Sequence, residues 1–440
     1  MRGHFTEPGA ARIRSGGVSI IGKARAGLLG PSYFYHRRLI EQSKTWSASQ
    51  IREYQERHLR PLTSRYGDEV TQKDDYRQDL RHFTRWDIPP LTHFVRTGGT
   101  SFQPLRFKAD TFSRRQKERA YLFDIWSQVG YAPFDLRVQY RGDARYHELI
   151  HFNRVENAWI ISPAETTEDQ LGILRQWAQT LPPFFLHVYP SSLYSFIDLI
   201  GDDLFRRLPV RGVLASSEAF LAGQQPRFEE EFGIPVAHWY GHSEYAVLAY
   251  CCRTCRGFHF YPTYGHVEFL PSDTEGCQRI VGTSFNRMGT QFVRYDTGDL
   301  AIAPVGSCPV DNFPRAEAIV GRSQETFVDS SGRRRSLFDY AAADLEHGPF
   351  WDLIKDLQFV QDRPGFLRLR IVASAGADKG TIQRTFERIC PLAELEFEYV
   401  PGIERSPSGK RRYFVDNTQS DSPTAVEQPR DVSQGRGRDA

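Results

Sequence analysis

From about residue 94 to residue 270, short apolar runs of strand length alternate with longer stretches that have helical spacing. The apolar runs are 184–188, 213–215, 236–239 and 267–270, and the helical stretches are 169–180, 193–200 and 220–232. Because strands that alternate with helices along a chain usually pair in parallel, this pattern predicts a large N-terminal lobe of mixed, mostly parallel sheets flanked by helices. The predicted fold class is α/β.

The segment before this region is predicted to be helical. Ser47, with Gln50 three residues later, forms a capping-box pattern. Ile51 and Tyr54 follow at helical spacing. We therefore expect early helices within residues 31–90.

A second, smaller lobe is predicted after Gly321 and Arg322, where the pattern starts afresh. Strand-like and helical runs follow in the order of a small α+β unit, at 357–361, 366–372, 381–390 and 395–400. The residues from about 417 to 440 are polar with almost nothing apolar among them, so they are expected to form a disordered tail. The predicted organisation is a large lobe at 1–320, with nucleotide motifs within 96–300 and a Cys/His insert at 251–259, a mobile small lobe at 321–416, and a tail at 417–440.

The composition of the chain excludes several classes of protein. Its 440 residues are 40% hydrophobic and 25% charged, which excludes a disordered chain, a collagen and a disulfide-stapled mini-protein. The formal net charge of +2 argues against non-specific nucleic-acid binding. No apolar run approaches the roughly 20 residues that span a membrane. Six cysteines do not make a disulfide framework, so the expected setting is cytoplasmic. From the charge and the apolar runs, no nucleic-acid or membrane partner is expected.

Lysine is scarce in this chain. Only eight of the 56 basic residues are lysines, and the others are arginines. Compositional bias explains most of this imbalance. A retained lysine can nevertheless mark chemistry that needs a compact ammonium group rather than a guanidinium.

Five short motifs carry candidate chemistry. In chain order they are 96–105, 240–244, 294–300, 321–322 and 405–411. The first is rich in glycine and hydroxyl groups, so its backbone could wrap around a phosphate. The second directly follows an apolar strand, where ligands bind in α/β sheets. Taken singly, the first motif is more often an ordinary turn and the second is about equally well explained as one, and the order of all five makes the signal specific.

The ordered set resembles the motif series of the adenylate-forming (AMP-binding) superfamily. Residues 97–104 stand where these enzymes have their phosphate loop, 240–244 (YGHSE) match YGxTE, 294–300 (RYDTGDL) match RYxTGDL, and 408–410 match the catalytic-lysine loop. Within the superfamily the chain is similar to the branch of phenylacetate–CoA ligases, CapK proteins and coenzyme F390 synthetases. The resemblance extends from the early helices to Lys410.

The resemblance implies a role for each matched residue. Lys410, Glu244 and Thr97 would act in catalysis, and Glu244 would coordinate Mg²⁺. The residues implied to bind ATP or AMP are Gly99, Thr100, Ser101, Glu218, Tyr240, Gly241, Ser243, Asp299 and Arg322. ATP and Mg²⁺ are the implied cofactors, and coenzyme A (CoA) is the implied co-substrate.

The chain departs from the family pattern in its phosphate loop and near the boundary between the lobes. Gly98 and Phe102 replace a usual serine and glycine, and Gln103 replaces the usual lysine. The loop therefore lacks its own cation. Gln324 stands where many relatives have an aspartate or lysine hinge.

The predicted activity is that of an AMP-forming acid–thiol ligase. Such an enzyme activates a carboxylic acid as an acyl-adenylate, releases pyrophosphate and transfers the acyl group to a thiol, here CoA. Two alternatives remain: adenylation with an acceptor other than CoA, as in the CapK and F390 synthetase relatives, and a catalytically degenerate nucleotide-binding scaffold. The identity of the acid and the oligomeric state stay open, with a dimer as one option.

A separate cluster of soft ligands indicates a metal site. Cys252 and Cys255 form a C-x₂-C pair, His259 follows four residues later, and Cys308 could supply a fourth ligand. This set fits tetrahedral Zn²⁺, and the F390 synthetase-like branch has a similar segment. The alternative is a group of reduced cysteines beside a core histidine. Four protein ligands would leave no open position, so the expected zinc is structural.

Overall fold

The structure of the chain is a computed structural model. It describes residues 29–88, 91–96, 105–111, 113–141, 148–161, 168–220, 223–304, 306–322, 326–330, 334–336, 353–390, 393–404 and 414–418. Several residues singled out in the sequence lie outside this description, namely Thr97, Gly98, Gly99, Thr100, Ser101, Phe102, Gln103, Gln324 and Lys410. Of the predicted tail, residues 419–440 also lie outside it.

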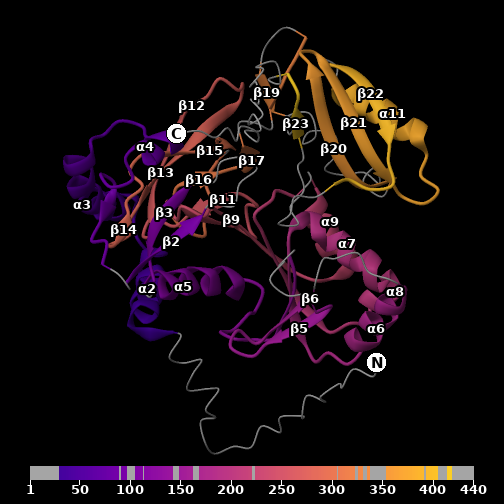
Figure 1. Cartoon of the computed structure of the whole chain (residues 1–440), viewed down its shortest axis with the longest axis horizontal. Coiled ribbons are helices and arrows are strands. Elements are labelled where there is room, and N and C mark those ends of the chain that lie inside the picture. Colours follow the sequence, from indigo (N-terminus) through magenta and orange to yellow (C-terminus); the bar gives the residue numbers. More distant parts are fainter. Residues whose placement is uncertain are drawn as a thin grey trace, which may run out of the picture.

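The helices of the described chain come in three groups: α2 to α4 precede the central strands in sequence, α5 to α9 alternate with them, and α11 lies in the C-terminal part (Figure 1). Their bounds are α2 (Gly30–Ser43), α3 (Ala48–Tyr66), α4 (Lys73–Gln78), α5 (Ser113–Ser127), α6 (Glu168–Ala178), α7 (Pro190–Ile200), α8 (Asp202–Phe205), α9 (Gln224–Phe232) and α11 (Lys379–Ile389). The predicted capping box begins α3: the Gln50 N–H donates to Ser47 Oγ over 3.3 Å, and the Ser47 N–H donates to Gln50 Oε1 over 2.8 Å. The sequence therefore located the start of this helix correctly.

A nine-stranded sheet forms the centre of the molecule. Its order is β16 (Arg315–Ala316), β11 (Phe258–Phe260), β10 (Leu248–Cys251), β9 (Val236–Gly241), β8 (Val210–Ser216), β7 (Phe184–Val188), β4 (Arg137–Tyr140), β6 (Ala158–Ile161) and β5 (Ile150–Asn153). The five strands from β9 to β6 are parallel, and the flanking pairs are antiparallel. The carboxyl ends of the parallel strands therefore lie at one edge, where α/β proteins bind ligands.

Apolar side chains explain why the parallel strands lie at the centre. Every residue of β7 is buried, and the core between the sheet and α6–α9 includes Phe196, Phe205 and Phe228. Continuous apolar strands are typical of parallel sheets that are covered on both faces. The predicted fold class, a mixed and mostly parallel α/β sheet flanked by helices, is confirmed.

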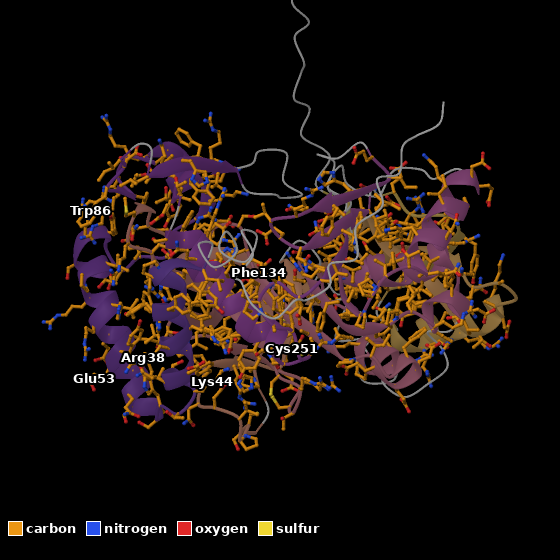
Figure 2. The ribbon with its side chains drawn as sticks, turned by 90° about the horizontal axis from the view of Figure 1, so that it is seen from below. Arg38, Lys44, Glu53, Trp86, Phe134 and Cys251 are labelled. Atoms are coloured by element: carbon orange, nitrogen blue, oxygen red, sulfur yellow. The ribbon has the colours of Figure 1, made fainter. Side chains whose placement is uncertain are left out.

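Smaller sheets surround the central one. The first is β1 (Thr84–Arg85), β14 (Gly289–Thr290), β3 (Arg106–Asp110) and β2 (Thr92–Arg96); the second is β12 (Gly265–Pro271), β13 (Cys277–Ser284), β15 (Tyr295–Ile302) and β17 (Ala318–Arg322); the third is β18 (Thr326–Val328) and β19 (Arg334–Ser336). Figure 2 shows Glu53 and Trp86 at the outer edge of the molecule, whereas Cys251 lies near its centre. Residues 97–104 connect β2 to β3.

The last sheet contains the predicted C-terminal elements. It has the order β22 (Glu394–Tyr399), β21 (Phe366–Ala373), β20 (Ile354–Arg363) and β23 (Phe414–Asp416). Gly365, with φ +74°, allows the tight turn between β20 and β21. With α11 this sheet encloses its own apolar core, which includes Leu369 and Phe386. In Figure 1 it lies at the upper right, away from α2 and α5.

None of the described helices combines the length and the hydropathy that a bilayer crossing requires.

Candidate functional site

Tyr240 and Asp299 meet between two sheets. Tyr240 lies near the carboxyl end of β9, and its hydroxyl donates a hydrogen bond to Asp299 Oδ2 over 2.7 Å. Burial and the neighbouring Asp299 carboxylate raise the pKa of Tyr240 well above its usual value, so the phenol keeps its proton. Asp299 of β15 is also the register partner of Arg322 in β17. Three residues predicted to bind the nucleotide are thus brought together by three strands.

Glu244 lies just beyond this pair, in the turn that follows β9. It is only 8% exposed, and its carboxylate contacts the His242 Nδ1 over 3.2 Å and accepts a hydrogen bond from the Tyr295 hydroxyl over 3.1 Å. Burial alone would raise the pKa of Glu244, but hydrogen bonding to His242 and the charge of that ring outweigh it and lower the pKa to about 2. The carboxylate therefore stays ionised at neutral pH, which is the form that binds Mg²⁺.

The other predicted nucleotide residues of the described chain line the same edge. Gly241 ends β9, and a Cβ there would come within 2.8 Å of Leu248 Cδ1, so the position favours glycine. Ser243 is partly buried in the turn between β9 and β10. Glu218 follows β8, and its carbonyl oxygen lies 3.1 Å from the Nε2 of His238 in β9. The side chain of Arg322 lies outside the description, as do Lys410 and the phosphate-loop residues.

A second polar cluster at this edge was missed by the sequence reasoning. Arg141 follows β4 and donates to His187 Nε2 over 2.7 Å and to Ser217 Oγ over 3.1 Å. Its guanidinium also lies 4.6 Å from the Tyr189 ring centroid. Burial, with the charge of Arg141 next in size, holds the pKa of His187 well below its usual range, so the ring is neutral and can accept. These residues are far apart in sequence, and only the adjacency of β4, β7 and β8 brings them together.

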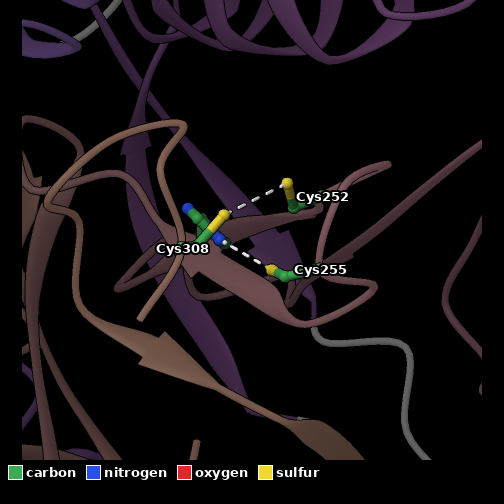
Figure 3. Close-up of side chains that lie close together, drawn as sticks. Cys252, Cys255 and Cys308 are labelled. Carbon is green, nitrogen blue, oxygen red and sulfur yellow. Dashed lines mark hydrogen bonds between the residues drawn. The ribbon is translucent and has the colours of Figure 1, made fainter. Parts of the chain in front are cut away.

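The four predicted zinc ligands converge. Their ligand atoms, on Cys252, Cys255, His259 and Cys308, all lie within 4.8 Å of one another. The Sγ atoms of Cys252 and Cys308 are 3.9 Å apart, and Cys255 Sγ is 3.2 Å from His259 Nε2 (Figure 3). Around tetrahedral Zn²⁺, ligand atoms are separated by about 3.4–3.8 Å, so the four side chains would have to draw together by about 1 Å or less to hold one ion.

The β10–β11 hairpin and one buried carboxylate hold the cluster. The Cys252 N–H donates to the Gly257 carbonyl over 2.8 Å, which closes the turn that carries Cys255. Behind it, His259 Nδ1 is 2.7 Å from the fully buried Asp311 carboxylate. A carboxylate on Nδ1 fixes the imidazole tautomer that leaves Nε2 free for a metal. Asp311 was not predicted, and it lies three residues after Cys308.

The thiols of this region differ in ionisation. Burial opposes the ionisation of Cys255, but hydrogen bonds with His259, the Gly257 backbone and Cys308 together outweigh burial and lower the pKa of Cys255 to about 7. Burial raises the pKa of Cys251 to about 12, and its Sγ lies 3.3 Å from the Arg256 carbonyl oxygen. Burial also raises the pKa of Cys308, to about 11, so ionisation does not separate Cys251 from the ligand set; position does, because the converging group contains Cys252, Cys255, His259 and Cys308 but not Cys251.

Comparison with known proteins identifies the fold. No family model and no curated protein matches the chain. A solved structure of 2-hydroxyisobutyryl-CoA ligase, in the postadenylation state with R3-HIB-AMP, matches with a TM-score of 0.58 at 16% sequence identity, covering 91% of this chain and 89% of that one. The same ligase with 2-HIB-AMP matches with a TM-score of 0.55 at 16% identity and the same coverage. The chain therefore has the fold of the adenylate-forming enzymes.

Proposed function

We propose that this chain is an AMP-forming acid–thiol ligase. The observation that carries the proposal is the grouping of Glu244, Tyr240 and Asp299 at the carboxyl edge of the parallel strands, in a chain with the adenylate-forming fold. The ligase of similar fold was solved with acyl-adenylates, and two of its structures also contain CoA. A carboxylic acid, ATP and CoA are accordingly the proposed substrates.

The proposed reaction has two steps. A carboxylate oxygen attacks the α-phosphorus of ATP, and the bond from that phosphorus to the leaving pyrophosphate breaks. The CoA thiol then loses its proton and attacks the acyl carbon, and AMP leaves. Glu244 would hold Mg²⁺, which neutralises charge on the phosphate oxygens, while Asp299 would bind the ribose hydroxyls and Tyr240 would pack against the adenine.

The two-lobe organisation belongs to the same proposal. Residues 321–416 would form a mobile small lobe that brings Lys410 to the site for the first step, and 417–440 would form its polar tail. Reorientation of one lobe between half-reactions is a known device for two-step catalysis. We also place the chain in the phenylacetate–CoA ligase and CapK branch, on the motifs quoted above.

The decisive experiment is ATP–pyrophosphate exchange with a panel of carboxylic acids. Exchange that depends on one class of acid is expected. Product analysis with and without CoA then separates a thioester-forming ligase from an enzyme with another acceptor. Tight ATP binding without exchange on any acid would contradict the proposal and favour a nucleotide-binding scaffold.

Replacing Glu244 with glutamine tests the metal-binding role. The neutral amide keeps the shape of the side chain but loses the charge that its surroundings hold ionised. An interaction with a charged group is worth about 1.5–3 kcal/mol, so the apparent affinity for Mg²⁺ in the exchange assay should fall about 10- to 100-fold. Glu53→Gln, an exposed carboxylate of α3 outside the candidate site, is the control and should leave the Mg²⁺ dependence unchanged. An unchanged Mg²⁺ titration in Glu244→Gln would remove Glu244 from the metal site.

We further propose that Cys252, Cys255, His259 and Cys308 bind one structural Zn²⁺. The donor set, its spacing and the Asp311 carboxylate behind His259 support this site. A complete set of four protein ligands has no position for water or substrate, so the ion would fix the β10–β11 hairpin rather than take part in the reaction.

A further inference from the structure

A cavity of about 440 Å³ opens beside Glu244. Its walls come from β3, from the loop that precedes β14 and from the first turns of α2 and α5. Its lining includes Glu244 but neither Tyr240 nor Asp299, so it begins at the proposed metal site and extends away from the adenine and ribose positions. A volume of 300–1,000 Å³ is typical of small-molecule sites.

One positive charge in this cavity belongs to a buried lysine. Lys117 of α5 is 5% exposed, and its Nζ donates to the Tyr264 carbonyl over 3.0 Å and to Asn286 Oδ1 over 3.2 Å. Both acceptors are neutral, and the ion pairs found among described residues include none of Lys117. Burial lowers the pKa of Lys117 to about 8, so the ammonium is still mainly charged at neutral pH.

Two arginines add to this positive field. Arg114 and Arg287 line the cavity. The first turns of α2 and α5 contribute Ser32 and Ser113 to the lining, and neither first turn contains an acidic residue. The N–H groups at these ends already have partners, since the Ser32 N–H donates to Gln116 Oε1 over 3.1 Å and the Ser113 N–H donates to Asp110 Oδ1 over 2.8 Å, so the positive field comes from the side chains.

The two carboxylates that line the cavity are already engaged. Asp110 accepts a hydrogen bond from the Ser113 N–H over 2.8 Å, and Glu244 is held by His242 and Tyr295. These hydrogen bonds do not remove the negative charge, and the neighbouring Glu118 also acts on Lys117, but the four cations of the lining, Lys108, Arg114, Lys117 and Arg287, outnumber its two carboxylates.

The remaining walls suit an organic anion. Tyr35, Phe107, Phe285 and Met288 line the cavity with aromatic and apolar surface. A phosphate or pyrophosphate ion would fill only part of this volume and would gain nothing from these side chains. Apolar walls with a few placed charges suit a ligand that has an apolar body and an anionic end.

We propose that this cavity holds the distal end of the acid substrate, and that Lys117 and Arg287 select acids carrying a second anionic group. This inference rests on the proposed function. The reacting carboxylate loses its charge when it becomes the acyl-adenylate, so a cation dedicated to it would face a neutral group after the first step. A second carboxylate keeps its charge through both steps, so a fixed buried ammonium suits it better.

The test compares monoacids and diacids of matched length in ATP–pyrophosphate exchange. The pairs are hexanoate with adipate, octanoate with suberate, and phenylacetate with 4-carboxyphenylacetate. Wild-type protein should prefer the diacid of at least one pair in kcat/KM, and Lys117→Met should lower that kcat/KM about tenfold or more through KM, while the monoacid changes little. Lys379→Met, an exposed lysine on α11, is the control and should change neither.

A binding measurement separates this inference from the proposed function. Without ATP, the preferred diacid should raise the melting temperature of wild-type protein and not that of Lys117→Met. If Lys117→Met does not fold, Arg287→Met, at an exposed position, replaces it in both assays. Equal preference for monoacids in all pairs, or stabilisation of Lys117→Met by the diacid as strong as that of wild-type protein, would overturn the inference. Absence of exchange with Lys117-dependent stabilisation by a diacid would overturn the proposed function and leave the anion site standing.

Discussion

Replacing Lys410 with arginine is expected to lower adenylation by about 10²–10³-fold, which is the cost of removing one positioned donor from a developing negative charge. The family resemblance places Lys410 at the phosphoryl group during the first step. A lysine ammonium is compact and can point at a single oxygen, whereas a guanidinium is wider and planar. The longer, forked side chain should therefore fail to occupy the same position, although it keeps the charge.

The measurement is single-turnover formation of the acyl-adenylate by Lys410→Arg and Lys410→Ala. Both variants should melt at the wild-type temperature and should still convert added acyl-adenylate and CoA to the thioester. Lys379→Arg is the matched control, because Lys379 is an exposed lysine of the same part of the chain. Adenylation at the wild-type rate in Lys410→Arg would show that the central catalytic assignment is wrong.

Removal of the proposed zinc ligands is expected to destabilise the protein strongly. Purified protein should contain about one zinc per chain, and Cys252→Ser or His259→Ala should lose the metal and melt at a clearly lower temperature. Metal binding by a site that exists only in the folded chain adds directly to folding stability. Cys251→Ser is the matched control, because Cys251 is the sequence neighbour of Cys252 but does not belong to the converging group, and this variant should keep its zinc.

Asp311 allows a finer test of the same site. Asp311→Asn keeps the four ligands and removes only the charge behind His259. Changes to such outer partners typically cost 10–100-fold in metal affinity, so competition with a chelator should show this loss in Asp311→Asn. Metal-free wild-type protein with an unchanged melting temperature would show that the cluster is a group of ordinary thiols.

The sequence predicted those parts of the fold that depend on local pattern. The capping box at Ser47 and the buried strand β7 each follow from neighbouring residues, so their locations could be predicted. The zinc cluster was predicted because three of its ligands lie within eight positions. The fourth, Cys308, came from its type and order in the chain, and the fold brings it to the others.

Other parts of the site could not be predicted, because they depend on which strands become neighbours. Arg141 contacts His187 and Ser217 only because β4, β7 and β8 are adjacent in the sheet. Lys117 lies in α5, a helix with almost no amphipathic pattern, so its sequence does not indicate which face is buried. Its burial under Asn286 is a tertiary contact across 169 positions, for which no local signal exists.

The hydrogen bond between Tyr240 and Asp299 links two sheets of the molecule. The two residues belong to separate sheets, and the apolar core between those sheets, which includes Phe260 and Ile280, has no directional bonds of its own. The Tyr240–Asp299 hydrogen bond therefore adds a directional link between the two sheets at the candidate site. A nucleotide that uses Asp299 must share or replace this bond, so its own contacts would then hold the layers in register.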